Sequence, residues 1–516
     1  RILQLAVEHP DGDPHFSSGL RDLEQWLGCL RLQLTVEDVS WWPLTPCGCA
    51  RNQQESLREH EAWITAWLTI WKHKKHELLA LESPDQAVSQ IPLMPLKMLL
   101  REMATNFVSP KVQAVGCLEL AGWCGSEASR KSVGELGGIE LVVGALRKHV
   151  QDSDVQQSGC RALEALARDA WNRKVISNLG GLSLVHEALR AHADVVEVQR
   201  RGCGALLRLL VDADACTLSG EFGGVEAVHA AMRDHPSDVE VQLLGCGVLG
   251  KLACNDENRD RILALDSVKL VHRAMRQHPD NLALQSWGCL MLRGVAFDGD
   301  TGHEIEQQDM CESVFERQAS ETELLDLDPQ AISVKAESVE LVLAAMRKHP
   351  AAVDIQQLGC EFFGAVAQTD AGRRSITEGG GLELIIAAAV GHEDDARLRQ
   401  WVCMALGSLA LDVSTRGLIG ELGGLQVVQD VMEKDLADEQ VQRWGCRAIL
   451  NLVYDGCSCN DLGDSGCLRT LQRAMRQHAA DTDVQRCCCR ALRDIARNES
   501  NRRQLRLHST VDLVLG

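Results

Sequence analysis

The chain has 516 residues, of which 45% are hydrophobic and 24% charged, and its formal net charge is −20 at pH 7. This acidic balance argues against a nucleic-acid binder and against a protein that as a whole binds anionic membranes. No apolar run reaches the ~20 residues that a membrane-spanning helix needs.

Residues 1–89 are predicted to be degenerate N-terminal repeats within an irregular helical region. Residues 2–10 resemble the tail of a helix, so the chain is expected to be a piece of a longer solenoid. Trp63, Trp67 and Trp71 follow one another at helical spacing, ahead of a basic run. An interfacial membrane helix would show this pattern. The favoured interpretation is an irregular repeat that buries its aromatic face.

From residue 90 onward a cysteine returns every 43 residues, with one longer step of 71. These ladder cysteines are Cys117, Cys160, Cys203, Cys246, Cys289, Cys360, Cys403, Cys446 and Cys489. Self-similarity at such a period is typical of a solenoid, in which one unit cannot bury its apolar faces alone. We therefore predict that stacked repeats build the core.

Other residues return in register with the ladder cysteine. A glutamine stands four residues before it, except at Arg399, and a glycine stands directly before it, except at Val402 and Cys488. Most repeats also carry a histidine eleven residues before the cysteine and a Gly-Gly pair 23 and 22 residues before it. The whole pattern, and not the cysteine alone, defines the repeat.

Each repeat is predicted to form three helices. The first ends at Gly-Gly, because a left-handed C-cap favours a residue without Cβ. The second, such as 225–233, ends in basic residues that suit the negative end of the helix dipole. The third, such as 241–252, carries the Gly-Cys pair. An arginine near the start of the first helix is expected to pair with carboxylates or carbonyls: Arg130, Arg173, Arg259, Arg373, Arg416 and Arg502.

This unit, with a long third helix that opens on Val-Gln, is similar to the armadillo repeat. The resemblance implies an all-α, right-handed α-solenoid of about nine to ten three-helix repeats, over residues 90–297 and 336–516, with the last one truncated. The His-Pro and Gly-Cys pairs resemble the armadillo region of leucine-rich-repeat protein kinases and armadillo repeat-containing protein 6. No kinase signature is present in the sequence. We predict a non-enzymatic protein-interaction scaffold; the alternative is a regulatory arm of a larger enzyme such as a leucine-rich-repeat protein kinase.

Residues 298–335 are predicted to form an acidic disordered insertion, where the first helix of the next repeat should begin. Residues 298–328 hold eleven acidic residues against Arg317, a composition typical of a disordered loop. Near its end, a short motif resembles the clathrin-box peptide: Leu324, Leu325, Asp326, Leu327 and Asp328. An acidic linker that leads into the next helix is the favoured alternative.

Stacking distance limits what the cysteines and histidines can do. Packed helices lie about 8–10 Å apart, whereas a disulfide needs Cα atoms within roughly 7 Å and zinc needs ligands within about 2.3 Å. The ladder cysteines should therefore be buried and unpaired, as in a reducing compartment, which is the cytoplasm or, as the alternative, the nucleus. Each histidine is expected to cap the second helix. Cys457, Cys459 and Cys467 lack the Cys-x-x-Cys spacing of a zinc site, so no metal and no cofactor is predicted.

In armadillo folds the third helices line a concave groove, and the resemblance maps its ladder onto positions one and five after each ladder cysteine. Nuclear-import receptors hold Trp and Asn there to clamp a basic peptide. This chain has one match and two basic stretches instead: Asn451; Arg161, Arg208 and Lys251; and Arg447 with Arg490. We predict a protein partner with an acidic extended segment, which residues 298–328 could imitate as an internal competitor. Solvated surface charge is the competing interpretation.

Overall fold

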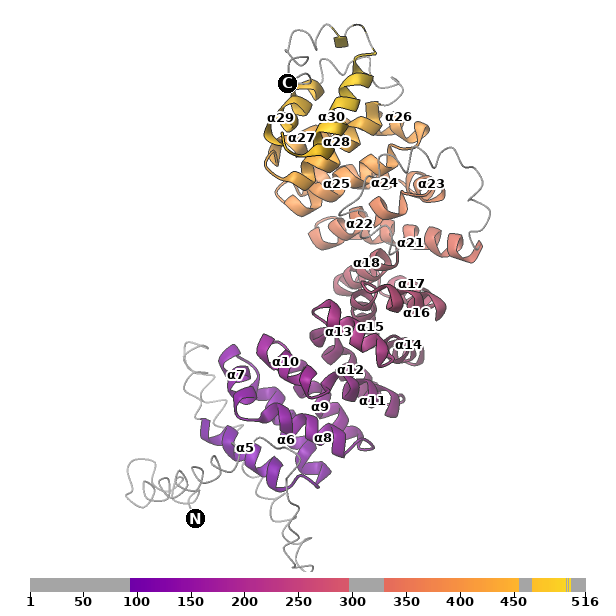
Figure 1. Ribbon diagram of the computed structural model, residues 1–516. Helices are drawn as coiled ribbons and strands as arrows, with labels where there is room; N and C mark the ends of the chain where they lie inside the picture. The colour runs from indigo at the N-terminus through magenta and orange to yellow at the C-terminus, as the bar shows by residue number, and fades with distance from the viewer. Residues whose placement is uncertain (1–92, 297–328, 454–465, 498, 500, 503–516) are drawn as a thin grey trace, which may run out of the picture. The chain divides into compact units, whose positions relative to one another are not determined.

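The computed structural model describes residues 93–296, 329–453, 466–497, 499 and 501–502 (Figure 1). Within these ranges the chain forms 24 α-helices and no strand, all inside one unit, Glu82–Gly516. Three predicted features lie outside the described residues: the region 1–89, the segment 298–328 with its clathrin-box-like motif, and Cys457 with Cys459.

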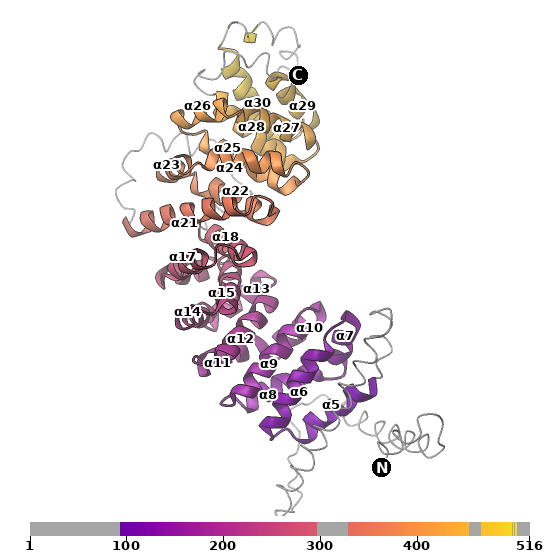
Figure 2. The same cartoon turned by 180° about the vertical axis from the view of Figure 1, so that it is seen from behind.

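The third helices are the continuous element of the stack. They are α6 (Pro110–Trp123), α9 (Ser153–Leu166), α12 (Val196–Leu209), α15 (Val239–Leu252), α18 (Leu282–Ala296), α22 (Val353–Val366), α25 (Ala396–Leu409), α28 (Glu439–Val453) and α30 (Thr482–Ile495). Each packs against the third helix of the next repeat, as the two opposite views show (Figures 1 and 2). Asp152 and Asp238 cap α9 and α15 by accepting a backbone N–H three residues on, a role that aspartate favours.

The first helices are short because a left-handed residue follows each of them. They are α7 (Glu127–Glu135), α10 (Ala170–Asn178), α13 (Ala213–Glu221), α16 (Asp256–Ala264), α23 (Asp370–Glu378) and α26 (Val413–Glu421). Gly137, for example, has a φ of 84°. The second glycine is required for another reason, since a Cβ on Gly138 would lie 2.8 Å from the carbonyl oxygen of Val133. Asp266, with a φ of 57°, is the one non-glycine with positive φ in the described ranges.

Most of the second helices end where the histidines stand. The second helices are α5 (Leu93–Thr105), α8 (Gly138–Lys148), α11 (Gly181–Ala191), α14 (Gly224–Asp234), α17 (Ser267–Gln277), α21 (Pro329–Lys348), α24 (Gly381–Gly391), α27 (Gly424–Lys434) and α29 (Cys467–Gln477). Helices α5 and α27 are followed by Asn106 and Asp435 instead. His149 is the C-cap of α8 and His192 that of α11; the backbone N–H of each donates to the carbonyl four residues earlier. The predicted capping role is confirmed.

The recurrent arginines donate hydrogen bonds to carbonyls at the ends of the third helices. Arg173 donates to the carbonyl of Ala167, 2.9 Å away, and Arg502 to that of Ala496, also 2.9 Å away. Arg130, Arg259, Arg373 and Arg416 likewise donate to the carbonyl six residues earlier. These carbonyls lie at the end of a helix, where no backbone N–H is available to them. The prediction that the arginines pair with carbonyls is therefore confirmed.

Side-chain hydrogen bonds fasten helices to one another in nearly every repeat. Gln199 donates to the carbonyls of Leu189 (2.9 Å) and His192 (2.8 Å). These carbonyls at the buried end of the second helix therefore have a hydrogen-bond donor. Nε2 of His235 lies 2.7 Å from the carbonyl oxygen of Ala193 in the preceding repeat. The glutamine contact recurs along the stack. The histidine contact reaches back 42 residues, or 70 where the insertion intervenes. His278 is the exception, since its Nε2 has no hydrogen-bond partner among the described residues.

At one junction, both the glutamine and the histidine that make these hydrogen bonds are replaced. Arg399 stands at the glutamine position of one repeat, and Asp435 stands at the histidine position of the next. Arg399, 8% exposed, pairs with Asp435 through two hydrogen bonds, one of 2.7 Å, and also donates to the carbonyl of Glu393. A histidine at 435 would reach that same carbonyl, because it lies 42 residues earlier. Arg399 thus supplies the hydrogen-bond donor to the carbonyl of Glu393, which an aspartate at position 435 cannot supply.

The ladder cysteines lie in the core. All of them except Cys489 are 0% exposed, and burial raises the pKa of Cys246 and Cys289, among others, to about 12. All nine ladder cysteines are free thiols. A thiol with such a pKa is almost fully protonated near neutral pH and is a poor nucleophile. The ladder therefore serves packing.

The glycine before the ladder cysteine faces a large side chain of its second helix. A Cβ on Gly245 would lie 2.5 Å from Cγ of Met232, and one on Gly159 would lie 2.5 Å from Cδ2 of Leu146. In the repeat of Val402 the corresponding second-helix residue is Ala389. In this repeat the larger residue, Val402, lies on the third helix and the small one, Ala389, on the second helix. The exchange keeps the side-chain volume of a closely packed core.

The stack continues across the interruption. Helix α18 packs against α22 although the step between their ladder cysteines is 71. Nη1 of Arg293 on α18 lies 2.7 Å from Oε1 of Glu361 on α22, and α17 also contacts α21. Helix α21 begins at Pro329, so residues 329–335 are helical although they fall inside the predicted insertion.

A second set of histidines, on the second helices, is buried between repeats. Nε2 of His186 lies 3.1 Å from Oγ of Ser219, and Nε2 of His272 lies 2.8 Å from Oγ of Ser338. Burial, aided by Arg190, lowers the pKa of His186 to about 4, and burial also lowers the pKa of His272. These imidazoles are neutral in the folded protein at pH 7.

We expect this burial to make the stack acid-sensitive. An unfolded histidine has a pKa of about 6.5, so between pH 6.5 and 4 the unfolded chain binds the extra proton and stability falls as the pH falls. Between pH 7.5 and 5.5, His186 should account for a loss of about 1.4 kcal/mol. Urea unfolding of His186→Gln beside wild type at both pH values measures this contribution. An identical pH dependence in the two proteins would contradict it.

Candidate functional site on the third helices

Exposure differs along the row of residues that directly follow the ladder cysteines. Arg161 is exposed on α9, and Leu118 is 41% exposed on α6. Four members of this row are buried between helices: Gly204, Gly247, Glu361 and Met404. Leu290, Arg447 and Arg490 are half-buried. Among the predicted cations in this row, Arg161 is therefore the most open to solvent.

The fifth position after the ladder cysteine lies at the seam between third helices. Nζ of Lys251 donates to the carbonyls of Leu207 (3.0 Å) and Leu210 (2.8 Å), at the end of the preceding third helix. Burial lowers the pKa of this lysine. Asn451, 8% exposed, donates to the carbonyl of Gly407 at 2.8 Å. These two predicted groove residues join neighbouring repeats, whereas Arg208 is exposed.

Three exposed arginines on α9, on the turn after it and on α12 define what we call the basic patch: Arg161, Arg168 and Arg208. Arg161 and Arg208 form no side-chain hydrogen bond or ion pair with another described residue. Arg168 and Arg208 both act electrostatically on Glu164, whose pKa burial nevertheless raises. Arg208 stands in the last turn of α12, where a cation is favoured by the helix dipole. Sequence reasoning missed Arg168, because it lies beyond the two positions of the expected ladder.

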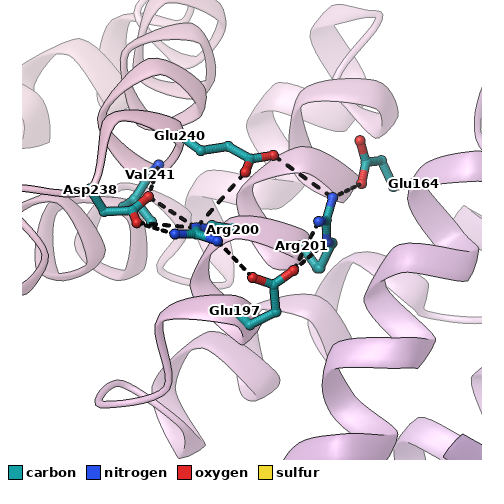
Figure 3. Close-up of polar contacts among 7 residues, drawn as sticks. All are labelled: Glu164, Glu197, Arg200, Arg201, Asp238, Glu240 and Val241. Atoms are coloured by element: carbon teal, nitrogen blue, oxygen red, sulfur yellow. Dashed lines mark hydrogen bonds and ion pairs between the residues drawn. The ribbon is translucent and has the colours of Figure 1, made fainter.

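An arginine network crosses three third helices (Figure 3), and it includes Glu164, on which Arg168 and Arg208 of the basic patch act electrostatically. It consists of Glu164 on α9, Glu197, Arg200 and Arg201 on α12, and Glu240 on α15 with its N-cap Asp238. Nη1 of Arg200 and Nη2 of Arg201 each lie 2.9 Å from Glu197. Nε of Arg200 lies 3.1 Å from Asp238, and Nη1 of Arg201 lies 3.8 Å from Glu164 and 3.8 Å from Glu240.

The arginine network holds its charges at fixed places. The hydrogen bonds to Asp238 raise the pKa of Arg200, and the same contact lowers the pKa of Asp238. Four carboxylates face two arginines, so the network is acidic overall, and the side chain of Glu240 is 47% exposed. The adjacent arginines were a visible signal in the sequence, but three of their four carboxylate partners come from other repeats. Glu197, Asp238 and Glu240 thus form an acidic border at the beginning of α12 and α15, and Arg208 lies toward the end of α12.

In the second predicted basic stretch, Arg447 with Arg490, one arginine contacts a tryptophan. The guanidinium of Arg447 lies 5.2 Å from the ring centroid of Trp444, a cation–π contact. Trp287 stands at the same register, two residues before its ladder cysteine, and a Cβ on Gly247 would lie 3.1 Å from its ring. Arg490 is half-buried on α30. The structure therefore places Arg447 on an aromatic ring, which the groove prediction did not foresee.

Stacked three-helix repeats with a continuous layer of third helices define an armadillo-type solenoid, a general protein-interaction fold. A family model described as LRRK2 ARM repeat matches residues 135–511, more than half of the chain. The chain belongs to this armadillo repeat family. No curated protein matches the sequence.

Two solved structures share the fold. One is an engineered protein that is 20% identical, with a TM-score of 0.61 over 81% of this chain and 91% of that chain. The other comes from work on a phosphorylation switch that controls the interaction between cadherin and beta-catenin; it is 12% identical, with a TM-score of 0.58 over 83% of this chain and 81% of that chain. They support the all-α architecture and its armadillo character.

The armadillo repeat region is itself a non-catalytic fold. In the ranges that the structure describes, no three His, Cys, Asp or Glu side chains are grouped so that they could hold a metal ion. Nor is any helix in those ranges long and apolar enough to cross a bilayer. The exposed third-helix surface that carries the basic patch is the candidate functional site.

Proposed function

We propose that the chain is a scaffold that binds an acidic, extended segment of a partner protein across α9 and α12. The observation that carries this proposal is the exposure of Arg161 and Arg208, neither of which is paired with another described residue. The acidic border of the arginine network would repel a misplaced acidic chain and so favour one path along the helix ends. Arg447 and Arg490 would extend the contact in the C-terminal repeats. Lys251 and Asn451 would support the surface from the seam.

A charge-reversed variant tests the proposal. A synthetic peptide of residues 298–328 serves as the acidic probe, and the protein is prepared without that segment. We expect Arg161→Glu with Arg208→Glu to weaken binding about tenfold at low ionic strength, and the difference should shrink in high salt. Isothermal titration gives both affinities. The matched control, Arg233→Glu with Arg397→Glu, reverses two exposed arginines outside the basic patch. An equal loss in the control, or no binding of the probe, would contradict the proposal.

The same probe tests whether residues 298–328 compete internally. If the segment occupies the basic patch, protein that lacks it should bind the free peptide more tightly in low salt than the intact chain does. A short glycine-serine linker replaces it, and the direct contact of α18 with α22 is expected to keep the stack intact. Equal affinities would show that the segment does not compete.

The family match favours a second candidate, that this scaffold is the regulatory arm of a larger enzyme such as a leucine-rich-repeat protein kinase. A full-length transcript that encodes a catalytic signature beyond these repeats would support it. The protonated, buried ladder thiols support a reducing compartment such as the cytoplasm.

A further inference from the structure

Two thiols of neighbouring repeats touch inside the last described junction. Sγ of Cys446 on α28 lies 3.2 Å from Sγ of Cys488 on α30, and both residues are 0% exposed. Cys489, the ladder cysteine of that repeat, is half-buried instead. The spacing argument considered only ladder cysteines paired with one another and therefore missed this contact. The two cysteines are 42 residues apart in the sequence, one residue less than the repeat period.

The contact arises because Cys488 replaces the glycine of the repeat. In every other repeat except that of Val402, the glycine leaves room for a second-helix methionine or leucine, such as Met232 against Gly245. Here Met475 keeps the large residue and Cys488 adds a side chain. Its thiol lies against the ladder cysteine of the preceding repeat. Cys487 and Cys467 are buried in the same region and raise the pKa of Cys446 further, after the hydrogen bond to Cys488 and burial.

We propose that Cys446 and Cys488 form an oxidant-dependent disulfide that joins α28 to α30. The sulfurs need to approach from 3.2 Å to about 2.05 Å, a small movement of two side chains. With hydrogen peroxide as the oxidant, one thiolate attacks the peroxide and gives a sulfenic acid and water. The second thiol then displaces the hydroxyl as another water. Two S–H bonds and the O–O bond break, one S–S bond forms, and peroxide takes both electrons and both protons.

Burial makes this reaction slow unless the junction opens. Neither sulfur is accessible in the closed stack, and a protonated thiol does not attack peroxide. Local opening of α30, the last third helix of the described stack, would admit the oxidant, and reclosure would bring the sulfurs together. Once formed, the bond prevents the two repeats from separating. The disulfide between Cys446 and Cys488 would therefore show that this junction has opened under oxidising conditions.

The test uses the full chain treated with hydrogen peroxide or with reductant, then mapped by non-reducing mass spectrometry. We expect a peptide pair joined through Cys446 and Cys488, and amide exchange in α30 at least several-fold slower than in reduced protein. Cys488→Gly restores the usual glycine and should lose both effects, whereas Cys489→Ser should keep both. Absence of the bond when the exposed Cys254 is fully oxidised would overturn the proposal. Slowing of α30 exchange on oxidation of Cys488→Gly as large as in the oxidised wild type would also overturn it.

Discussion

Arg399→Gln should destabilise the junction of α25 and α27 by about 3–5 kcal/mol, the loss expected when a buried ion pair loses one partner. The substitution leaves Asp435 without its counter-charge and Glu393 without the donor to its carbonyl. Asp435→His alone should also destabilise, because it brings an imidazole against the guanidinium. The double variant restores the glutamine and histidine of the other repeats and should recover most of the stability. Amide exchange in α25 and α27, together with urea unfolding, measures the four proteins.

Transplanting the pair provides the matched control. Gln199 and His235 stand 36 residues apart, as Arg399 and Asp435 do. Gln199→Arg alone should bury an unpaired charge, and adding His235→Asp should rescue it. Additive effects in both cycles would mean that the residues act independently, against the paired replacement described here.

Gly159→Val should cost about 1–3 kcal/mol, because the added carbons enter the space of Leu146. Leu146→Ala alone should cost about 2–5 kcal/mol through the cavity it leaves. Together they reproduce the arrangement of Val402 with Ala389, so the double variant should be considerably more stable than the sum of the two losses predicts. Urea unfolding followed by helical circular dichroism gives the coupling energy.

An exposed glycine controls for the backbone effect of the same substitution. A Cβ on Gly417 would meet nothing within 4 Å, so Gly417→Val should be close to neutral or slightly stabilising. A loss at Gly417 as large as that at Gly159 would assign the effect to helix propensity. The proposed exchange of large and small residues would then be wrong.

The sequence period predicted the architecture because each repeat contains the same local instructions. Gly-Gly at the end of the first helix, histidine at the end of the second and the buried ladder cysteine all lie where they were expected. The arginines that close the third helices follow the same logic, since donor and acceptor are six residues apart. Local chemistry of this kind is visible in one repeat.

Contacts between repeats were harder to predict, because spacing fixes a residue's register but not which neighbour it meets. Lys251 and Asn451 were expected to face a partner, and they instead reach back to the preceding third helix. The arginine network was missed because its members belong to three repeats. Cys488 was missed because its proximity to Cys446 depends on a replaced glycine. In each case the deciding fact is a distance between helices.

The continuity of α18 and α22 has a practical consequence for work with this protein. Helices α18 and α22 are in direct contact there, so we expect them to keep this packing when the connection between them is changed. A fluorescent domain or an affinity handle encoded at this point would leave the repeats on either side in register. The junction is thus a natural place for a label that follows the scaffold without weakening it.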